Sequence, residues 1–339
     1  MKNDFEEDKY LKLFLEQWIN HKSYIIARSS GSTGIPKEIR LQKSYMICSA
    51  LRTGKFFDFQ AEEKVLLPIP IRYIGGMMMI VRALVFDLDL YVRPARAYPF
   101  YPMTFDFDFS PMTPMQAYDL LSDEKGKAFF LSIRNIILGG SGVSEELQSK
   151  IEDLPNRVYS TYGMTETISH IALRSLNQPK EEFYKVLPGI EIDSDADNCL
   201  IIKDESGSCF KTNDIVLIQD KNQFIVKGRK DNIINSGGKK IIPEELEKRI
   251  ENLLTLKNSF FVFGIDNERF GDKLCLLEEV KEGMVSDFDI FNCELLKVEL
   301  EKNCCPKEFF SIDSFVYTDT GKINRKASIE LFHKTKKGC

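Results

Sequence analysis

A run of hydroxyl side chains, glycines and one lysine follows the short apolar stretch Tyr24–Ala27, which predicts a strand leading into a loop. The glycines allow a tight turn close to a ligand, and the hydroxyl and ammonium groups can donate to phosphate oxygens. A Walker A loop is excluded, because Pro36 stands where that motif requires its last glycine. A phosphate-binding loop and a plain Ser/Gly-rich surface turn both fit these residues. They are Ser29, Ser30, Gly31, Ser32, Thr33, Gly34, Ile35, Pro36 and Lys37.

A second polar stretch, Thr161–Thr167, directly follows the predicted strand Arg157–Tyr159. Within it, Tyr162 could stack on a nucleobase, Thr165 could bind a phosphate, and Glu166 could hold Mg²⁺ against phosphate oxygens. Taken alone, the stretch is better explained as a turn followed by a capped helix start.

Three later positions carry groups with two possible uses each. Asp214 could accept hydrogen bonds from a ribose diol, with Arg229 on the same ribose or on a phosphate, or the two could form a surface ion pair. The pair Gly237–Gly238 could let a long thin ligand approach the backbone, or could form only a tight turn. Lys322 follows a glycine near the C-terminus and could swing into an active site or simply be solvated.

The composition sets limits on the kind of protein. A chain of 339 residues with 43% hydrophobic and 29% charged residues predicts a soluble globular protein of two domains. A net charge of -5, with both signs mixed along the chain, argues against a nucleic-acid partner. Eight cysteines without a Cys-x-x-Cys motif, beside only three histidines, argue against a zinc site and favour free thiols in a reducing compartment.

The sequence suggests neither a signal peptide nor a membrane-spanning segment. The first eight residues are acidic and lack the apolar region of a signal peptide. The longest apolar stretch, Gly75–Phe86, is interrupted by Arg82 and is too short to span a bilayer. We therefore expect a cytoplasmic protein.

Strands and helices alternate through the first part of the chain, which predicts a largely parallel, helix-covered sheet. Ligands of such sheets bind beyond the carboxyl ends of the strands, where the turn Gly139–Gly142 falls. The predicted strands are 64–68, 88–92, 135–138 and 157–159, and the predicted helices are 43–57, 75–87 and 113–121. The aromatic tract 98–109 is interpreted as core packing under a loop, with an apolar substrate wall as the weaker option.

Beyond residue 189 the pattern changes to short strands, predicted at 199–202, 215–218 and 224–226, with a hairpin turn at 220–222. A domain boundary is predicted after Gly228, which gives a large N-terminal domain, 1–228, and a small mobile α+β domain, 229–339. The second domain is expected to contain a helix from Pro243, strands at 260–265, 273–280 and 312–317, and a helix at 291–303.

The order and spacing of these stretches resemble the superfamily of adenylate-forming enzymes, which comprises acyl-CoA synthetases, adenylation domains of peptide synthetases and luciferases. Five motifs in the family's order over nearly the whole chain argue strongly against chance. The matching segments are Ser29–Lys37, Tyr162–Glu166, Asn213–Asp214, Gly228–Asp231 with Ser236–Gly238 and Pro243–Glu247, and Gly321–Lys322. Within the superfamily, residues 162–170 with 236–239 look most like a short o-succinylbenzoate–CoA ligase.

The resemblance implies two half-reactions: a carboxylate reacts with ATP to give an acyl-adenylate and pyrophosphate, and the thiol of coenzyme A then displaces AMP. It assigns catalysis to Lys322, Thr165 and Glu166, with Glu166 also the Mg²⁺ ligand, and it makes Asp231 the hinge of the small domain. ATP binding is assigned to Ser29, Ser30, Gly31, Ser32, Thr33, Gly34, Lys37, Gly139, Gly140, Ser141, Tyr162, Gly163, Asp214 and Arg229. Coenzyme A is assigned to Gly237 and Gly238, and the acyl group to Tyr73, Ser169 and His170. Arg72 and Arg82 are further candidates for the unreacted carboxylate.

The chain departs from the family pattern in four respects. Glu38 replaces the glycine that commonly follows the loop lysine, and Asn213 replaces the glycine before the ribose-binding aspartate. Tyr73 stands near the position of a common histidine. The chain also reaches the phosphate loop by residue 29, so part of the usual first subdomain is expected to be missing or rebuilt.

The leading hypothesis is therefore an ATP-dependent acid–CoA ligase for o-succinylbenzoate in menaquinone biosynthesis. The alternatives are adenylation of another acid, transfer to a carrier protein, or a module that binds an adenylate without turnover. The expected partner is a small-molecule carboxylate, with no nucleic acid and no membrane insertion, in a monomer or homodimer.

Overall fold

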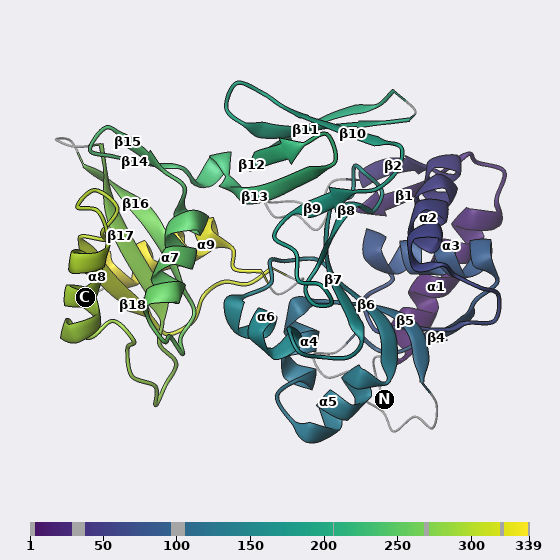
Figure 1. Ribbon diagram of the computed structural model, residues 1–339, viewed down its shortest axis with the longest axis horizontal. Coiled ribbons are helices and arrows are strands. Elements are labelled where there is room, and N and C mark those ends of the chain that lie inside the picture. The colour runs from purple at the N-terminus through teal and green to yellow at the C-terminus, as the bar shows by residue number, and fades with distance from the viewer. Residues whose placement is uncertain are drawn as a thin grey trace. The chain divides into compact units, whose positions relative to one another are not determined.

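The computed structural model describes residues 4–28, 38–95, 106–205, 207–267, 271–318 and 322–337. The chain forms two compact units (Figure 1). The first comprises Met1–Glu191 with Lys203–Phe210 and Thr318–Lys322. The second comprises Ile192–Ile202, Lys211–Tyr317 and Ile323–Cys339.

The strands of the first unit's main sheet lie in the order β9-β8-β7-β6-β5-β3-β4. Strands β4, β3, β5, β6 and β7 are mutually parallel, whereas β8 and β9 continue the sheet antiparallel. The predicted largely parallel sheet is confirmed. Their bounds are β3 Lys64–Leu67, β4 Asp89–Val92, β5 Phe107–Met112, β6 Ile133–Leu138, β7 Arg157–Gly163, β8 His170–Ser175 and β9 Tyr184–Val186. A separate antiparallel pair is formed by β1 Tyr24–Arg28 and β2 Glu38–Gln42.

Neighbouring residues of one strand enter two different hydrophobic cores, because successive side chains of a strand point to opposite faces. Ile137 of β6 packs in the core beneath α1 Asp4–Ile19, α2 Lys43–Phe57 and α3 Ile74–Phe86. Ile136 and Leu138 enter the core beneath α4 Pro114–Leu120, α5 Glu124–Leu131 and α6 Glu145–Ile151. Figure 1 shows the two groups of helices on opposite sides of the strands. The first unit is therefore a three-layer structure.

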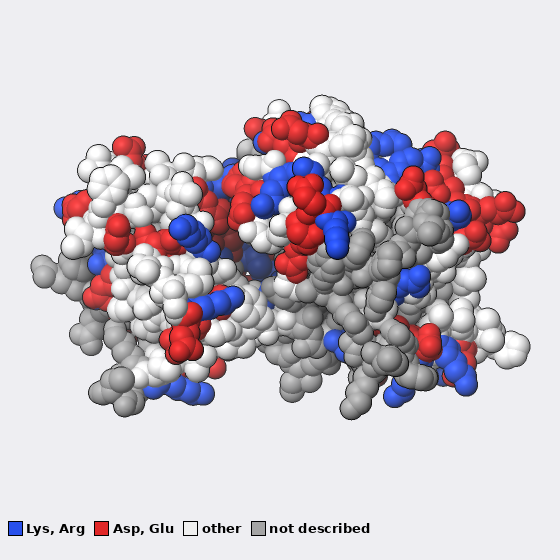
Figure 2. All heavy atoms as spheres, turned by 90° about the horizontal axis from the view of Figure 1, so that it is seen from below, with Lys and Arg blue, Asp and Glu red and all other residues white. Residues whose placement is uncertain are grey.

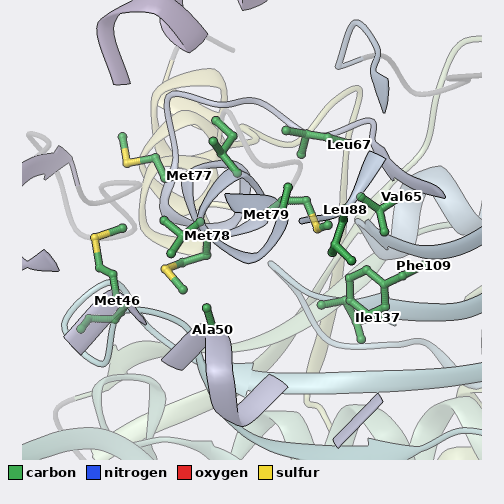
Figure 3. Packing of buried hydrophobic residues seen from close by; sticks show 14 of the residues in the cluster. Met46, Ala50, Val65, Leu67, Met77, Met78, Met79, Leu88, Phe109 and Ile137 are labelled. Atoms are coloured by element: carbon green, nitrogen blue, oxygen red, sulfur yellow. The ribbon is translucent and has the colours of Figure 1, made fainter. Parts of the chain in front are cut away.

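Methionines fill much of the core between α2, α3 and the sheet (Figure 3). Met78 and Met79 of α3 are fully buried, as is Met46 of α2. The two helices approach closely at Gly54, where a Cβ atom would lie 2.1 Å from the Phe86 ring. Flexible thioether side chains suit such an irregular interface.

Two groups of paired strands and three α-helices are present among the described residues of the second unit. Strands β10 Ile190–Ser194, β11 Cys199–Asp204, β12 Cys209–Asp220 and β13 Gln223–Arg229 lie side by side in this order. After the short helix η1 Lys230–Asn232, the other sheet has the order β15-β14-β17-β16, with β18 parallel to β17. Its strands are β14 Ile234–Ser236, β15 Lys239–Ile241, β16 Phe260–Asn267, β17 Gly271–Glu279 and β18 Glu308–Ile312. The helices are α7 Pro243–Leu253, α8 Ile290–Glu299 and α9 Arg325–Lys337.

Most predicted elements of regular structure are present, and two predictions near the C-terminus are wrong. The strand expected at 312–317 is β18 at Glu308–Ile312, and Tyr317 makes only an isolated antiparallel bridge to Ile323. The helix expected to reach residue 303 ends at Glu299. Along the chain, the first change from one compact unit to the other falls between Glu191 and Ile192. The domain boundary predicted after Gly228, with a hinge near 229–231, stays a prediction.

Several general expectations can be compared with the described part of the chain. The seven cysteines it includes are all free thiols. None of its helices is both long and apolar enough to cross a membrane. Acidic and basic side chains are interspersed over the face shown in Figure 2.

Candidate active site

The Ser/Gly-rich segment predicted to hold phosphates, Ser29–Lys37, lies outside the described residues. The strands on either side of it are described, and the strand predicted before it is confirmed as β1. Strands β1 and β2 pair antiparallel, with Ala27 opposite Ile39. The two described strands that precede and follow the segment in sequence are therefore neighbours.

The predicted turn after β6 lies at the carboxyl edge of the parallel strands. Met112, Leu138 and Ser160 are in register across β5, β6 and β7, so the loops that follow them leave the same edge. Gly139 donates its N–H to the Met112 carbonyl at 3.0 Å, and a Cβ atom there would lie 2.7 Å from Thr161 Oγ1. This is the edge where ligands of parallel sheets bind.

Gly140 and the residue after it complete this turn. Gly140 has φ +94°, in the left-handed region that glycine tolerates best, and a Cβ atom there would meet nothing within 4 Å. Ser141, which follows, is half-buried. A flat ligand could therefore approach the backbone here without a side chain in the way.

The stretch after β7 forms a hydrogen-bonded turn, and the capped helix start preferred for it in isolation is wrong. The Thr167 hydroxyl accepts from the Met164 N–H at 3.1 Å and lies 2.9 Å from the Ser169 carbonyl oxygen, to which it donates. Gly163 permits this fold, since a Cβ atom there would lie 2.3 Å from the Ser169 oxygen. The turn leaves Thr165 half-buried and Glu166 exposed. Both are accessible to a ligand.

Tyr162 lies at the end of β7 with its ring half-buried. It packs edge-on against Tyr184, with ring centroids 5.9 Å apart. The Tyr184 hydroxyl in turn lies 2.8 Å from the Ser160 hydroxyl. An aromatic platform therefore adjoins the Gly139–Ser141 turn, because β6 and β7 are paired neighbours.

Arg82 is a fully buried cation in the middle of the apolar helix α3, with an exposed fraction of 1%. Its Nη2 donates to Ser169 Oγ at 2.8 Å, and its Nε has no hydrogen-bond partner in the described part of the chain. Among the described residues no carboxylate forms an ion pair with it. Burial disfavours the charged form, so the pKa of Arg82 falls from 12.5 to about 9.

His170 completes this buried cluster. Its Nε2 lies 3.1 Å from the Thr53 hydroxyl, and its Nδ1 lies 3.4 Å from the Ser169 hydroxyl. Burial, and secondarily the charge of Arg82, hold the His170 pKa well below its ordinary value. His170 is therefore neutral at pH 7, and the cluster carries one positive charge without a counter-ion among the described residues.

Tyr73 stands at the N-cap of α3 and is half-buried. The Arg72 guanidinium lies 5.0 Å from the centroid of its ring. The loop before them is held from α1, because the buried Glu7 carboxylate accepts the Ile71 N–H at 2.9 Å. The structure brings Arg82 together with Ser169 and His170, and it places Arg72 beside Tyr73 instead.

Asp214 and Arg229 face each other across β12 and β13, as paired residues of the ladder. Arg229 Nη1 donates to Asp214 at 3.2 Å, and its Nη2 donates to Asp231 at 2.9 Å. The predicted ribose-binding residues and the predicted hinge residue are thus in one cluster. Sequence reasoning noted Asn213 only as a departure, yet its amide also donates to Asp231, at 3.1 Å.

Gly237 and Gly238 form the turn between β14 and β15, both with positive φ. Ser236 and Lys239 pair on either side of the turn. Lys239 forms an ion pair with Glu301. The predicted pair of glycines is therefore a tight hairpin turn, with open space around a Cβ atom at Gly238.

Lys322 is exposed beside a small hairpin stem. Its backbone N–H donates to Thr318 Oγ1 at 3.1 Å, and Tyr317 bridges Ile323. The Tyr317 hydroxyl donates to the buried carboxylate of Glu279 at 2.8 Å. Burial and this carboxylate raise the pKa of Tyr317 to about 12.

Arg325 follows on the same stem. It is half-buried, donates to both carboxylate oxygens of Glu247 at 2.7 and 2.6 Å, and lies 5.3 Å from the Phe261 ring centroid. The coulombic and hydrogen-bond effects of Glu247 outweigh desolvation and raise the Arg325 pKa. The residues on both sides of Lys322 are therefore held by carboxylates, of which Glu279 is buried and Glu247 half-buried. Neither of these contacts was predicted, since Glu247 and Glu279 both lie far from Lys322 in sequence.

Comparisons with known proteins agree with the fold. A family model described as AMP-binding enzyme matches residues 13–208. The 2-succinylbenzoate–CoA ligase of Staphylococcus epidermidis is 27% identical over 330 residues, which cover 88% of this chain and 68% of that protein.

Solved structures of similar fold are also found. An acyl-CoA synthetase (AMP-forming)/AMP-acid ligase II-like protein from Dyadobacter fermentans is 33% identical with a TM-score of 0.64, covering 96% of this chain and 94% of that chain. O-succinylbenzoate coenzyme A synthetase from Bacillus subtilis, in complex with ATP and magnesium ion, has a TM-score of 0.73. It covers 90% of this chain and 69% of that chain, and at 20% identity it shows a common fold. The chain therefore belongs to the AMP-binding enzyme family.

Proposed function

We propose that the protein is an ATP-dependent acid–CoA ligase whose acid is o-succinylbenzoate, and that it serves menaquinone biosynthesis. The observation that carries the choice of acid is the buried Arg82 cluster. A buried guanidinium without an anion is costly, and a substrate carboxylate beside it would remove most of that cost. The names of the curated relatives support the same acid.

The first half-reaction joins two anions. A carboxylate oxygen of the acid bonds to the α-phosphorus of ATP while the bond to the β-phosphate oxygen breaks, which releases pyrophosphate. Because the reacting groups repel each other, the site must supply positive charge and oriented donors. In our proposal the segment Ser29–Lys37 would hold the β- and γ-phosphates, Thr165 would contact the α-phosphate, and Glu166 would hold Mg²⁺, which would supply positive charge to the phosphates. Lys322 bridges the carboxylate and the α-phosphate, a role suited to a compact charge on a long stem.

The nucleoside would lie at the carboxyl edge of β6 and β7. Adenine would pack on Tyr162 beside the Gly139–Ser141 turn, where the glycine geometry supports a close approach. The ribose would bind Asp214 and Arg229. This placement follows the rule that ligands of parallel sheets bind at this edge.

The second half-reaction forms the thioester. The sulfur of coenzyme A attacks the acyl carbonyl carbon, and the bond from that carbon to the phosphate oxygen breaks, which releases AMP. We propose that Gly237 and Gly238 line the path of the pantetheine arm. Rotation about Asp231 would exchange the groups that serve the two half-reactions.

The acid itself would lie against α3 and β8. One carboxylate reacts, and the other would pair with Arg82 and accept from Ser169, with neutral His170 beside it. Tyr73 is proposed as part of the acyl wall. A monocarboxylic acid would leave the Arg82 charge without a partner, so the cluster favours a dicarboxylic acid.

The test is a panel of acids assayed with ATP and Mg²⁺, with and without coenzyme A, following pyrophosphate and thioester separately. We expect both products with o-succinylbenzoate and much less with benzoate, decanoate or succinate. Pyrophosphate with a fatty or simple aryl acid but not with o-succinylbenzoate would refute the choice of acid. Pyrophosphate without thioester would point to a carrier protein as the acceptor. If no acid gave pyrophosphate, the proposal that the protein is an adenylate-forming enzyme would be refuted.

A further inference from the structure

We propose that Asn213 is a positioning residue of the nucleotide site, which holds the Asp231 carboxylate and so keeps Arg229 available to Asp214 and the ribose. The inference rests on the proposed roles of Asp214 and Arg229 in ribose binding. It concerns a residue at which this chain departs from the glycine of the family pattern.

The geometry begins with a cross-strand pair. Asp214 and Arg229 lie opposite each other on β12 and β13, and β13 ends at Arg229. The one-turn helix η1 follows at once and returns the Asp231 carboxylate toward β12. There the Asn213 amide nitrogen lies 3.1 and 3.2 Å from the two oxygens of that carboxylate. Asn213 and Arg229 therefore hold the same carboxylate.

The charges explain why a second donor is useful. Arg229 donates from Nη1 to Asp214 and from Nη2 to Asp231, so one guanidinium is divided between two carboxylates. A ribose diol bound to Asp214 needs the pair Asp214–Arg229 in a fixed place. Without Asn213, Asp231 would have to be compensated by Arg229 to a greater extent, and the guanidinium would be drawn away from Asp214. The neutral amide of Asn213 compensates Asp231 without adding a charge.

The neighbours of Asp231 are tied to different parts of the second unit. Lys230 donates to Asp197, in the turn between β10 and β11, at 2.7 Å. Asn232 donates to Glu244 in the first turn of α7. Asp231 thus lies between a residue bound to the β10–β11 turn and a residue bound to α7. A bond from Asn213 to this residue connects the ribose-binding strand with the proposed hinge.

The experiment measures AMP binding by calorimetry, always with the full chain. The samples are the unaltered protein, the single variants Asn213→Ala, Asn213→Asp and Asp231→Ala, and the double variant Asn213→Ala with Asp231→Ala. We expect Asn213→Ala to weaken AMP binding by about threefold to tenfold, the range for a hydrogen bond at an exposed charged pair. Asn213→Asp should weaken it more, since a third carboxylate competes for Arg229. In the Asp231→Ala background, Asn213→Ala should have no further effect.

A second ligand separates positioning from a general structural effect. Binding of 2′,3′-dideoxy-AMP, which lacks the ribose diol, should be the same in the full chain and in Asn213→Ala. The midpoint of thermal unfolding should also be unchanged, because the Asn213 side chain is exposed. Three outcomes would overturn this inference while leaving the proposed nucleotide site intact. They are unchanged AMP binding in Asn213→Ala, an equal loss of affinity for AMP and for 2′,3′-dideoxy-AMP, and a further loss of AMP affinity when Asn213→Ala is added to Asp231→Ala. If the unaltered protein binds no AMP, the proposed nucleotide site fails, and this inference fails with it.

Discussion

Replacing Arg82 with methionine should stabilise the ligand-free protein and impair its use of the acid. The pKa of Arg82 falls from 12.5 to about 9 on burial, a gap of about 3.5 pH units. At about 1.4 kcal/mol per unit, the protein gives up about 5 kcal/mol to keep this guanidinium charged at pH 7. Methionine fills a similar space, and the same helix already holds three buried methionines.

Part of that gain is lost with the hydrogen bond from Arg82 to Ser169. A hydrogen bond to a charged group contributes about 1.5–3 kcal/mol, so the net gain in the free energy of unfolding should be about 2–3.5 kcal/mol. Urea unfolding of the ligand-free protein measures this quantity, as a higher midpoint at unchanged slope. Pyrophosphate exchange with o-succinylbenzoate should show a KM raised at least tenfold, because the second carboxylate has lost its cation.

Arg134→Met is the matched control. Its guanidinium is half-exposed in a pair with Glu63 and Asp108, so the free energy of unfolding should change by less than about 1 kcal/mol. A loss of stability in Arg82→Met would refute the claim that the charge lacks compensation in the free protein. An unchanged KM would refute the placement of the substrate carboxylate.

Three other predictions concern single groups. Lys322→Ala should slow pyrophosphate formation by about 100-fold or more yet leave thioester formation from preformed acyl-adenylate within about threefold, and equal loss of both steps would contradict the assigned role. The pKa of His170 is lowered in the folded protein, so below pH 6.5 the unfolded chain binds a proton that the folded protein does not. The free energy of unfolding should therefore fall as the pH falls, by up to about 1.4 kcal/mol per pH unit. Urea unfolding between pH 7 and 5 should show a shallower decline in His170→Asn, and identical declines would refute the lowered pKa. Tyr317→Phe removes a donor from the buried Glu279 carboxylate and should cost about 1–3 kcal/mol in urea unfolding, whereas Tyr118→Phe, whose partner Glu146 is exposed, should cost less than about 1 kcal/mol.

Elements defined by local pattern could be predicted from the sequence. Helix α7 begins at Pro243 as expected, with Leu246 and Ile250 buried at helical spacing. The strand β3 was recognised from its short apolar run. Such signals depend on neighbours within a few positions, so a single chain contains them in full.

Elements and site residues fixed by distant contacts could not be predicted. Tyr317 donates to Glu279, 38 residues away, and makes an isolated bridge to Ile323. The local sequence could not distinguish this arrangement from the strand that was expected there. The Arg82 cluster draws on Thr53, which is 117 residues from His170 and carries no signal of its own in the sequence. The other members, Arg82, Ser169 and His170, were candidates for the acyl site through the family resemblance, but their contact with one another could not be predicted.

The alternation of β6 between two cores also restricts how the chain length of this protein can vary during evolution. A one-residue insertion within β6 would turn Ile137 toward the core that now holds Ile136 and Leu138, and would shift Gly139 away from Met112. Both layers and the ligand edge would be lost together. Insertions and deletions tolerated in this part of the fold should therefore fall in the connections before Ile133 or after Ser141, and comparison of many related chains would show such a gap-free block.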